Sequence, residues 1–206
     1  MEVSKDKQET LLKTALRLFV ERGFYGTPTS LISKEAGVAT GTLFFYFKTK
    51  EDLIDTLYRQ VKAEAAEAMC RGLDNEPDAK AKLLLLGRNA VAWGTEHHEK
   101  MKFMEFFAHS PFVSTTAQKE GMSRFLFMQD LIEEGIREGT IRDIDTGLLI
   151  FMMASSFSGL IARVAAAGSE SERETIIGQG LDFVWNGLAA DNDKEQNNSK
   201  RSKGKT

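Results

Sequence analysis

The stretch GVATGTLFFYFKTKEDL, residues 37–53, decides how the N-terminal part of the chain folds. It sets four aromatic residues side by side at positions 44–47, with threonines before them and lysines and acids after them. A core helix does not need the hydroxyls and lysines, and a solvent-facing helix does not favour the rings. Leu43 and Phe47 lie four residues apart and share one helical face. We expect these two to pack inward and the hydroxyl-bearing side to face outward.

The residues that precede this stretch indicate two further helices. An apolar stripe predicts a helix over residues 5–22, which Gly23 ends because glycine adopts the left-handed cap conformation without strain. Thr27 and Pro28 predict the N-cap and the first residue of a short helix over 28–36.

The quoted stretch itself continues the pattern. Gly37 makes a turn into a second short helix over 40–47, and Thr49, with Asp52 three residues later, predicts the capped start of a long helix that reaches about residue 70. Two short helices across a glycine turn, preceded by a longer one, form a helix-turn-helix unit with its supporting helix.

The rest of the chain is also helical in pattern, and no convincing segment has the period-two alternation of a strand. Helices are expected at 78–96, 99–109, 115–138, 145–167 and 171–189. The predicted fold class is all-α. An N-terminal three-helix helix-turn-helix domain covers 5–65, with its motif at about 28–47, and a C-terminal helical domain covers 66–190. The segment 191–206 has no apolar residue, so we expect a disordered polar tail.

Composition indicates a soluble protein of a reducing compartment. The 206 residues include one cysteine, Cys70, so an intrachain disulfide is ruled out. The start lacks the apolar core of a secretory signal, and no apolar run reaches about eighteen residues, so we expect a cytoplasmic chain without a membrane span. The net charge is −3, yet the first fifty residues hold eight Lys or Arg against five Asp or Glu. This mildly basic part suits a phosphate backbone.

A helix-turn-helix places its second helix in the major groove of DNA, with the early residues of that helix at base edges. Threonine hydroxyls there bond bases or phosphates, a glycine allows close backbone approach, and lysines beyond the helix meet phosphates. The predicted DNA-contacting residues are Thr29, Thr40, Gly41, Thr42, Leu43, Phe45, Tyr46, Lys48 and Lys50.

The same residues carry a family resemblance. GVATGTLFFYFKTKEDL resembles the signature of TetR-family transcriptional repressors, a G-V-S-x-G-x-L/I-Y-x-H/Y-F run followed by a short basic link and K-E-x-L. The upstream segments TPTSLISKEAG and ALRLFVERGFYG match as well, so the resemblance covers about residues 5–65. It implies a double-stranded DNA operator, a homodimer and a small effector bound by the C-terminal domain.

The chain departs from the family pattern at two neighbouring positions. The family usually has tyrosine at position 44, where the hydroxyl bonds a phosphate, and Phe44 cannot do this. Phe45 stands where a polar residue is common, so we expect it to contact DNA through apolar surface such as a thymine methyl. The alternative is that both rings fill a thick core.

The C-terminal part has the composition of a pocket for apolar ligands. Residues 101–157 contain six of the eight methionines and eight of the fourteen phenylalanines, and methionine adapts to irregular space. Core packing is the alternative for each residue taken singly. The predicted effector-contacting residues are Trp93, Met104, Phe107, Phe125, Met128 and Gln129.

The last two predicted helices have the pattern of a dimer interface. GLLIFMMASSFSGLIARVAAAG, residues 147–168, is apolar or small almost all round, so both of its sides need a cover. Pairing with a second copy would form a four-helix bundle, which is also the family's usual dimer interface. The predicted interface residues are Phe151, Ser155, Gly159, Ala162, Leu181 and Trp185.

Nothing in the sequence predicts an enzyme, a metal or a cofactor. Glu96-His97-His98-Glu99 is the one cluster that resembles a metal site, but it lacks the HExxH spacing, and adjacent histidines point apart on a helix. Two alternatives to a repressor stay open. One is an all-helical small-molecule carrier, or protein-interaction module, that does not bind DNA. The other is a helical enzyme that uses His97 or His109.

Overall fold

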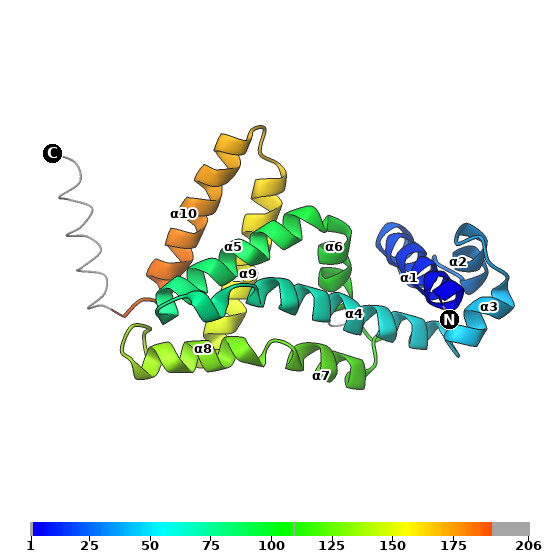
Figure 1. The fold of residues 1–206 in the computed structure, drawn as a ribbon, viewed down its shortest axis with the longest axis horizontal. Coiled ribbons are helices and arrows are strands. Elements are labelled where there is room, and N and C mark those ends of the chain that lie inside the picture. Colours follow the sequence, from blue (N-terminus) through cyan, green and yellow to red (C-terminus); the bar gives the residue numbers. More distant parts are fainter. Residues whose placement is uncertain (1, 109, 191–206) are drawn as a thin grey trace. The chain divides into compact units, whose positions relative to one another are not determined.

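A computed structural model describes residues 2–108 and 110–190 of the chain, and helices make up most of this part (Figure 1). The predicted polar tail at 191–206 and His109 lie outside the described residues. The elements are α1 (Glu2–Arg22), α2 (Thr29–Glu35), α3 (Thr40–Tyr46), α4 (Lys50–Cys70), a 3-10 turn η1 (Leu73–Asn75), α5 (Ala79–Glu96), α6 (His98–Phe107), α7 (Thr115–Ser123), α8 (Leu126–Arg137), α9 (Thr146–Ala165) and α10 (Glu170–Leu188). The predicted all-α class is confirmed.

The chain divides into two compact units. The first unit comprises Met1–Glu64 and His97–Arg124, so α6 and α7 group with the N-terminal helices. The second unit comprises Ala65–Glu96 and the described residues from Phe125 onward, with η1, α5, α8, α9 and α10. Helix α4 passes from the first unit into the second between Glu64 and Ala65.

The core of the first unit is built on the apolar stripe of α1. Leu11, Leu18 and Phe19 are fully buried, as the helical spacing predicts. Helix α6 packs on α1, and the rings of Phe19 and Phe107 lie 5.9 Å apart. This packing explains why α6 belongs with the N-terminal helices although it lies far from them in sequence.

The start of α2 differs from its prediction. Thr27 is not the N-cap: this position is held by Pro28, without a side-chain hydrogen bond. The Thr27 hydroxyl is buried and is within donating distance of two carbonyl oxygens. These belong to Leu18, at 3.0 Å, and to Gly23, at 2.8 Å. Thr27 therefore fastens the turn to α1. The predicted cap of α4 is confirmed, because the Asp52 backbone N–H donates to the Thr49 hydroxyl at 3.0 Å.

The single helix predicted over 115–138 is wrong, since the chain breaks between α7 and α8. The Ser123 hydroxyl donates to the Glu120 carbonyl at 2.8 Å, which competes with helical bonding, and Phe125 has φ −106° and ψ 10°. The two pieces belong to different units.

In the second unit, glycines let the helices approach closely. A Cβ added to Gly87 would lie 2.5 Å from a methyl of Leu181, and one added to Gly180 would lie 2.5 Å from a methyl of Leu160. The apolar faces of α5, α9 and α10 thereby pack against one another.

Helix α9 has a large apolar surface. With a mean hydropathy of 1.8 it is long and apolar enough to cross a membrane by length and composition, a property that core helices of soluble proteins share. Only 28% of this stretch is buried. Much of its apolar side is therefore left uncovered by the described residues.

Candidate nucleic-acid interface

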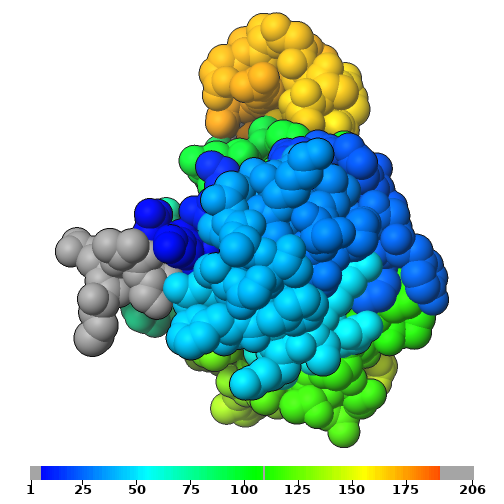
Figure 2. Space-filling model, turned by 90° about the vertical axis from the view of Figure 1, so that its right-hand side faces the viewer, coloured from blue at the N-terminus to red at the C-terminus, as the bar shows by residue number. Residues whose placement is uncertain are grey.

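Helix α3 sits on an apolar base and presents its other side to solvent. Leu43 and Phe47 are 0% and 1% exposed and pack inward, as predicted, together with Ile32 of α2. The turn between α2 and α3 is made at Gly37, whose φ of 68° favours glycine. Figure 2 shows this surface of the first unit, with α2 and α3 in light blue toward the viewer.

Most of the residues predicted to contact DNA lie on this open side. Thr40, Gly41, Phe45 and Lys48 are exposed. Thr29, Thr42 and Tyr46 are half-buried. They form one surface of α2, α3 and the link that follows α3.

Leu43 and Lys50 do not belong to this surface, and their prediction as DNA contacts is corrected. Leu43 is fully buried in the base of α3. The Lys50 ammonium donates a hydrogen bond to the Phe24 carbonyl and lies 3.9 Å from the centre of the Phe24 ring. Burial lowers the pKa of Lys50, against a smaller opposing effect of Glu51. Lys50 therefore joins the start of α4 to the turn after α1.

The two phenylalanines at the family's polar positions are on the surface. Phe45 is 76% exposed and Phe44 is 43% exposed, so the alternative in which both fill a core is wrong. The ring of Phe45 stands edge-on to that of Tyr46, with centroids 5.2 Å apart and an interplanar angle of 85°. This contact orients an apolar ring that the rest of the chain leaves in solvent.

Gly41 occupies open space. Apart from its own helix, no atom of the described chain lies within 4 Å of where its Cβ would be, and its φ is not positive. Glycine in a helix is less stable than alanine by about 0.5–1 kcal/mol. Neither packing nor backbone conformation within the chain explains this glycine, whereas close approach of a partner would.

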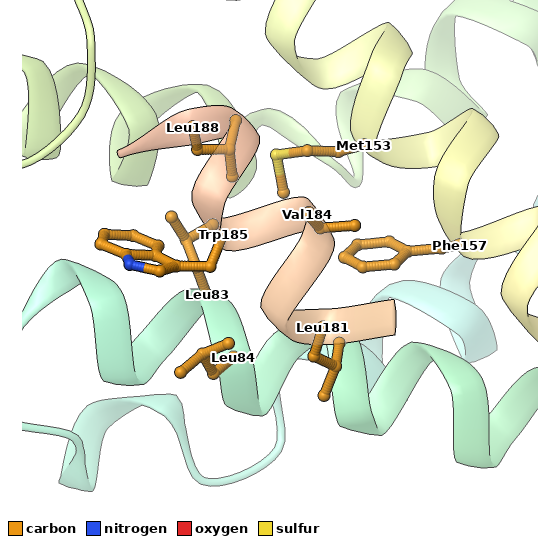
Figure 3. A pocket seen from close by; sticks show the side chains of 8 residues that line it. All are labelled: Leu83, Leu84, Met153, Phe157, Leu181, Val184, Trp185 and Leu188. Atoms are coloured by element: carbon orange, nitrogen blue, oxygen red, sulfur yellow. The ribbon is translucent and has the colours of Figure 1, made fainter. Parts of the chain in front are cut away.

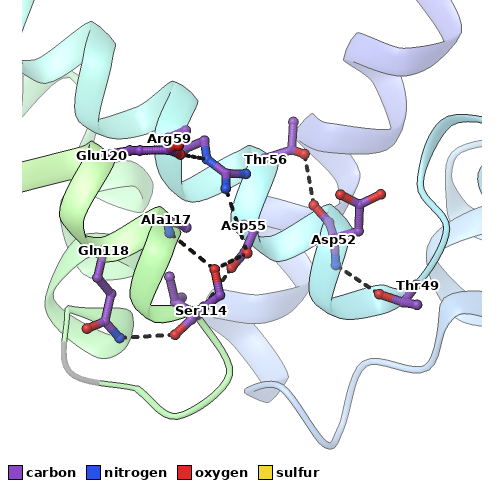
Figure 4. Close-up of polar contacts among 10 residues, drawn as sticks. Thr49, Asp52, Asp55, Thr56, Arg59, Ser114, Ala117, Gln118 and Glu120 are labelled. Carbon is purple, nitrogen blue, oxygen red and sulfur yellow. Dashed lines mark hydrogen bonds and ion pairs between the residues drawn. The ribbon is translucent and has the colours of Figure 1, made fainter.

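A polar link between α4 and α7 was not predicted (Figure 4). The Asp55 carboxylate accepts hydrogen bonds from the Ser114 backbone N–H, at 2.8 Å, and from the Ser114 hydroxyl. The same hydroxyl accepts from the Ala117 N–H at 3.1 Å and caps α7. One turn along α4, Arg59 binds Glu120. The cap was readable in the sequence Ser114-Thr115, but its partner on α4 was not.

An aromatic stack joins the loop before α7 to the turn after α1. The rings of Phe24 and Phe112 are parallel, with centroids 4.1 Å apart and an interplanar angle of 2°. Tyr25 meets Phe112 edge-on at 4.9 Å. Since Phe24 also accepts the Lys50 ammonium, this turn connects α1, α4 and the loop.

The residues predicted to contact an effector are divided between the units. Met104 and Phe107 lie in the first unit, and Trp93, Phe125, Met128 and Gln129 lie in the second. Trp93, Phe107 and Met128 are buried, and Met104 and Phe125 are half-buried. Gln129 is exposed and donates to Glu133 at 2.7 Å.

A separate small cavity lies in the second unit between α5, α9 and α10 (Figure 3). It encloses about 10 Å³, roughly the room of one water molecule. Its lining is apolar except for the indole nitrogen of Trp185: Leu83, Leu84, Met153, Phe157, Leu181, Val184, Trp185 and Leu188. None of the predicted effector contacts lines it.

The predicted interface residues of α9 are exposed, and those of α10 are not. Phe151 is 66% exposed, and Ser155, Gly159 and Ala162 follow it along the same open side. Leu181 and Trp185 are 5% and 3% exposed because they pack in the core of the second unit, so they cannot form an interface surface. The exposed apolar residue of α10 is instead Phe183, at 75%.

Among residues 2–108 and 110–190, no three His, Cys, Asp or Glu side chains are grouped in a way that would hold a metal ion. His97 precedes α6 as its N-cap residue and has no side-chain capping bond.

The comparisons with known proteins point in one direction. A family model described as bacterial regulatory proteins, tetR family, matches residues 11–57. An uncharacterized HTH-type transcriptional regulator of Bacillus subtilis, YhgD, is 28% identical over 194 residues, which cover 91% of this chain and 100% of the relative. The fatty acid metabolism regulator protein of the same organism is 26% identical over 145 residues, covering 69% and 75% of the two chains.

Solved structures share the whole fold. A tetR-family regulator from Shewanella sp. PV-4 superimposes with a TM-score of 0.81 at 29% identity and covers 89% of this chain and 98% of its own. One from Marinobacter aquaeolei VT8 has a TM-score of 0.82 at 23% identity, with 92% and 100% covered, which shows the fold alone.

Helix α3 is short and packs on buried apolar residues, and its outer side carries hydroxyls and Gly41. This is the form that a helix needs to enter a major groove. This helix lies within the segment that the family model matches. Residues 11–57 therefore match the DNA-binding part of the tetR family of bacterial regulatory proteins, and over most of its length the chain is similar to DNA-binding transcriptional regulators.

Proposed function

We propose that the chain acts as a cytoplasmic homodimer that represses transcription and leaves its operator when a small apolar effector binds. The observation that carries this proposal is the open outer side of α3, with exposed Thr40, Gly41 and Phe45 above the buried Leu43. One α3 helix reads a few base pairs, and a pair of them related by two-fold symmetry reads successive major grooves.

The exposed side of α9, together with α10, supports dimerisation. Phe151 and Phe183 are large, apolar and more than half exposed. Gly159 on α9 and Gly187 on α10 are helical glycines whose Cβ would meet no atom of the described chain within 4 Å. Exposed rings beside glycines that pack against nothing in the described chain are suited to close packing of a partner helix. A second copy of the chain would supply this helix and give the two-fold symmetry of the proposed operator.

An apolar effector is supported by composition and by relatives. One relative is named a fatty acid metabolism regulator, and a structural neighbour from Bacillus subtilis is described in complex with stearoyl-CoA. Long-chain acyl thioesters are therefore the first compounds to test. We place the effector in the second unit, near Trp93, Phe125 and Met128. The small cavity beside Leu181 is lined by other residues, and at about 10 Å³ it is too small for such an effector.

Helix α4 would carry the signal, since it runs from the second unit into the first. Asp55 and Arg59 fix α4 to α7, and Lys50 fixes its start to the turn after α1. A tilt of α4 would thus move the helix-turn-helix as well. The effector must bind the DNA-free state more tightly than the DNA-bound state, by the free energy of the coupling.

A gel-shift titration tests the proposal. The full chain is titrated onto duplex DNA from its own upstream region and onto random DNA at one stated salt concentration, with stearoyl-CoA added and free coenzyme A as control. We expect preference for the upstream duplex, release by the acyl thioester only, and loss of affinity in Thr42→Ala but not in Thr10→Ala, which removes an exposed hydroxyl from α1. A carrier or protein-interaction module without DNA binding would not distinguish the two duplexes, and neither variant would matter.

A further inference from the structure

The outer side of α3 carries more apolar surface than hydrogen-bonding capacity. Its sequence, TGTLFFY, contains no Arg, Lys, Asn, Gln, Asp or Glu. Arginine or lysine on guanine and asparagine or glutamine on adenine are the side chains that make paired hydrogen bonds to base edges. The two threonines and Tyr46 can supply at most single hydroxyl bonds. The largest exposed group on this side is the ring of Phe45.

Only one base has a complementary feature in the major groove. The C5 methyl of thymine is an apolar group at the groove edge, and the other three bases present polar atoms there. An exposed phenyl ring gains free energy against a methyl group and gains less against an amino group or a carbonyl that loses its water.

The surroundings of Phe45 favour DNA as its partner over another apolar surface. The exposed cations Lys34 on α2 and Lys48 after α3 belong to the same helix-turn-helix, and the uncluttered Gly41 is one turn before Phe45. The ring of Phe45 lies edge-on to that of Tyr46, whose hydroxyl can bond DNA beside it. A docking site for an apolar protein surface would not need the lysines.

We propose that Phe45 is the specificity-determining residue of this chain and that it selects operator positions by contact with thymine methyl groups. The proposal rests on the proposed function, because it concerns the same surface. Thr40 and Thr42 bond bases or phosphates beside it, and they add little discrimination of their own. The operator therefore carries thymine opposite Phe45 in each site that an α3 helix enters.

Replacement of thymine by deoxyuridine isolates this contact, since it removes the methyl and keeps the base pair. A duplex is first selected by the full-length chain from a library with a random central region. Each thymine of the selected duplex is then replaced singly, and Kd is measured for the wild-type chain, Phe45→Ala, Phe45→Leu and Phe106→Ala. Phe106 is a matched control, because it is an exposed ring on α6 of the same unit, at 59% exposure.

At one or more thymines, the wild-type Kd should rise about fourfold for each methyl removed. Phe45→Ala should bind the thymine and uracil duplexes equally at those positions, and Phe106→Ala should retain the wild-type difference. If Phe45→Ala binds too weakly for its Kd to be measured, Phe45→Leu is used instead. Its Kd values for the thymine and uracil duplexes should differ less than those of the wild type. Circular dichroism confirms that the variants are folded, as expected for exposed side chains.

Two outcomes would overturn the inference and leave the proposed function standing. One is a selected duplex in which no thymine-to-uracil exchange weakens wild-type binding. The other is an exchange that weakens wild-type and Phe45→Ala equally. If the chain selects no duplex over random DNA, the proposed sequence-specific DNA binding is refuted. The proposed selection of thymine by Phe45 is then refuted as well.

Discussion

Replacement of Gly41 by alanine should make the free chain more stable and its complex with DNA weaker. Gly41 lies in the first turn of α3, and the added methyl would meet no atom of the described chain within 4 Å. The gain from restricted backbone entropy in the unfolded chain is about 0.5–1 kcal/mol. For a chain of 206 residues this corresponds to a rise in Tm of about 1–4 °C.

The effect on DNA binding has the opposite sign. If the DNA backbone or a base edge approaches the Gly41 Cα closely, the methyl forces a displacement whose cost resembles that of overpacking, about 1–3 kcal/mol. Kd should therefore rise about 5- to 150-fold. A series of Gly41→Ala, Gly41→Ser and Gly41→Val should weaken binding progressively with side-chain volume.

Two measurements on the same preparations decide the outcome. Thermal unfolding gives the change in Tm. Gly178→Ala on α10 is the reference for the expected rise in Tm, since a Cβ added there would also occupy open space. Fluorescence anisotropy with the selected duplex gives Kd. If Gly41→Ala gains stability and binds DNA as tightly as the wild type, the reasoning that this glycine serves DNA approach is refuted.

Three further changes probe the contacts around this surface. Asp55→Ala removes the acceptor of Ser114, and urea unfolding should show a loss of about 1–2 kcal/mol in the free energy of unfolding; an unchanged midpoint would mean that the link contributes nothing. Phe151→Glu places a charge on the open side of α9, and sedimentation should show a monomer where the wild type is a dimer. Lys48→Gln should reduce the slope of log K against log salt concentration by about 0.9 for the phosphate contact that is lost. Lys50→Gln should lower Tm and leave this slope unchanged. Equal slopes in the two variants would contradict the assignment of Lys48 to DNA and of Lys50 to the Phe24 carbonyl.

The N-terminal helices were predictable because each signal is local. The apolar stripe of α1, the turn at Gly37 and the cap at Thr49 depend on residues within one or two turns of one another. Leu43 and Phe47 were assigned to the inner side of α3 by spacing alone, and both are buried. The exposed position of Phe45 follows from the same geometry.

Two contacts of the first unit join side chains to partners that are distant in sequence. Lys50 looks like a phosphate contact beside Lys48, yet its ammonium binds the carbonyl of Phe24, which lies 26 residues away. Asp55 and Ser114 are 59 residues apart, and neither sequence neighbourhood specifies the other. Long side chains with several rotamers take whichever partner the tertiary fold supplies, so sequence position alone does not decide between solvent, DNA and a neighbouring helix.

The break between α7 and α8 shows a similar limit. Apolar periodicity continues from residue 115 to 138, but the helix is interrupted at Phe125, just after a serine that bonds back to Glu120. Such a bond is local, but serine also occurs within intact helices, so the residue type does not distinguish the two situations.

Two surfaces of this chain that depart from the rules of local stability are the ones proposed to face partners. A helical glycine without an internal neighbour and a phenylalanine in solvent both reduce the stability of the free chain. Both occur on α3, at Gly41 and Phe45, and both occur again at Gly159 with Phe151 on α9. A sequence that specifies one structure is expected to break such rules only where function requires it. On this argument we propose that the folded chain keeps α3 open for DNA and α9, together with α10, open for a second copy.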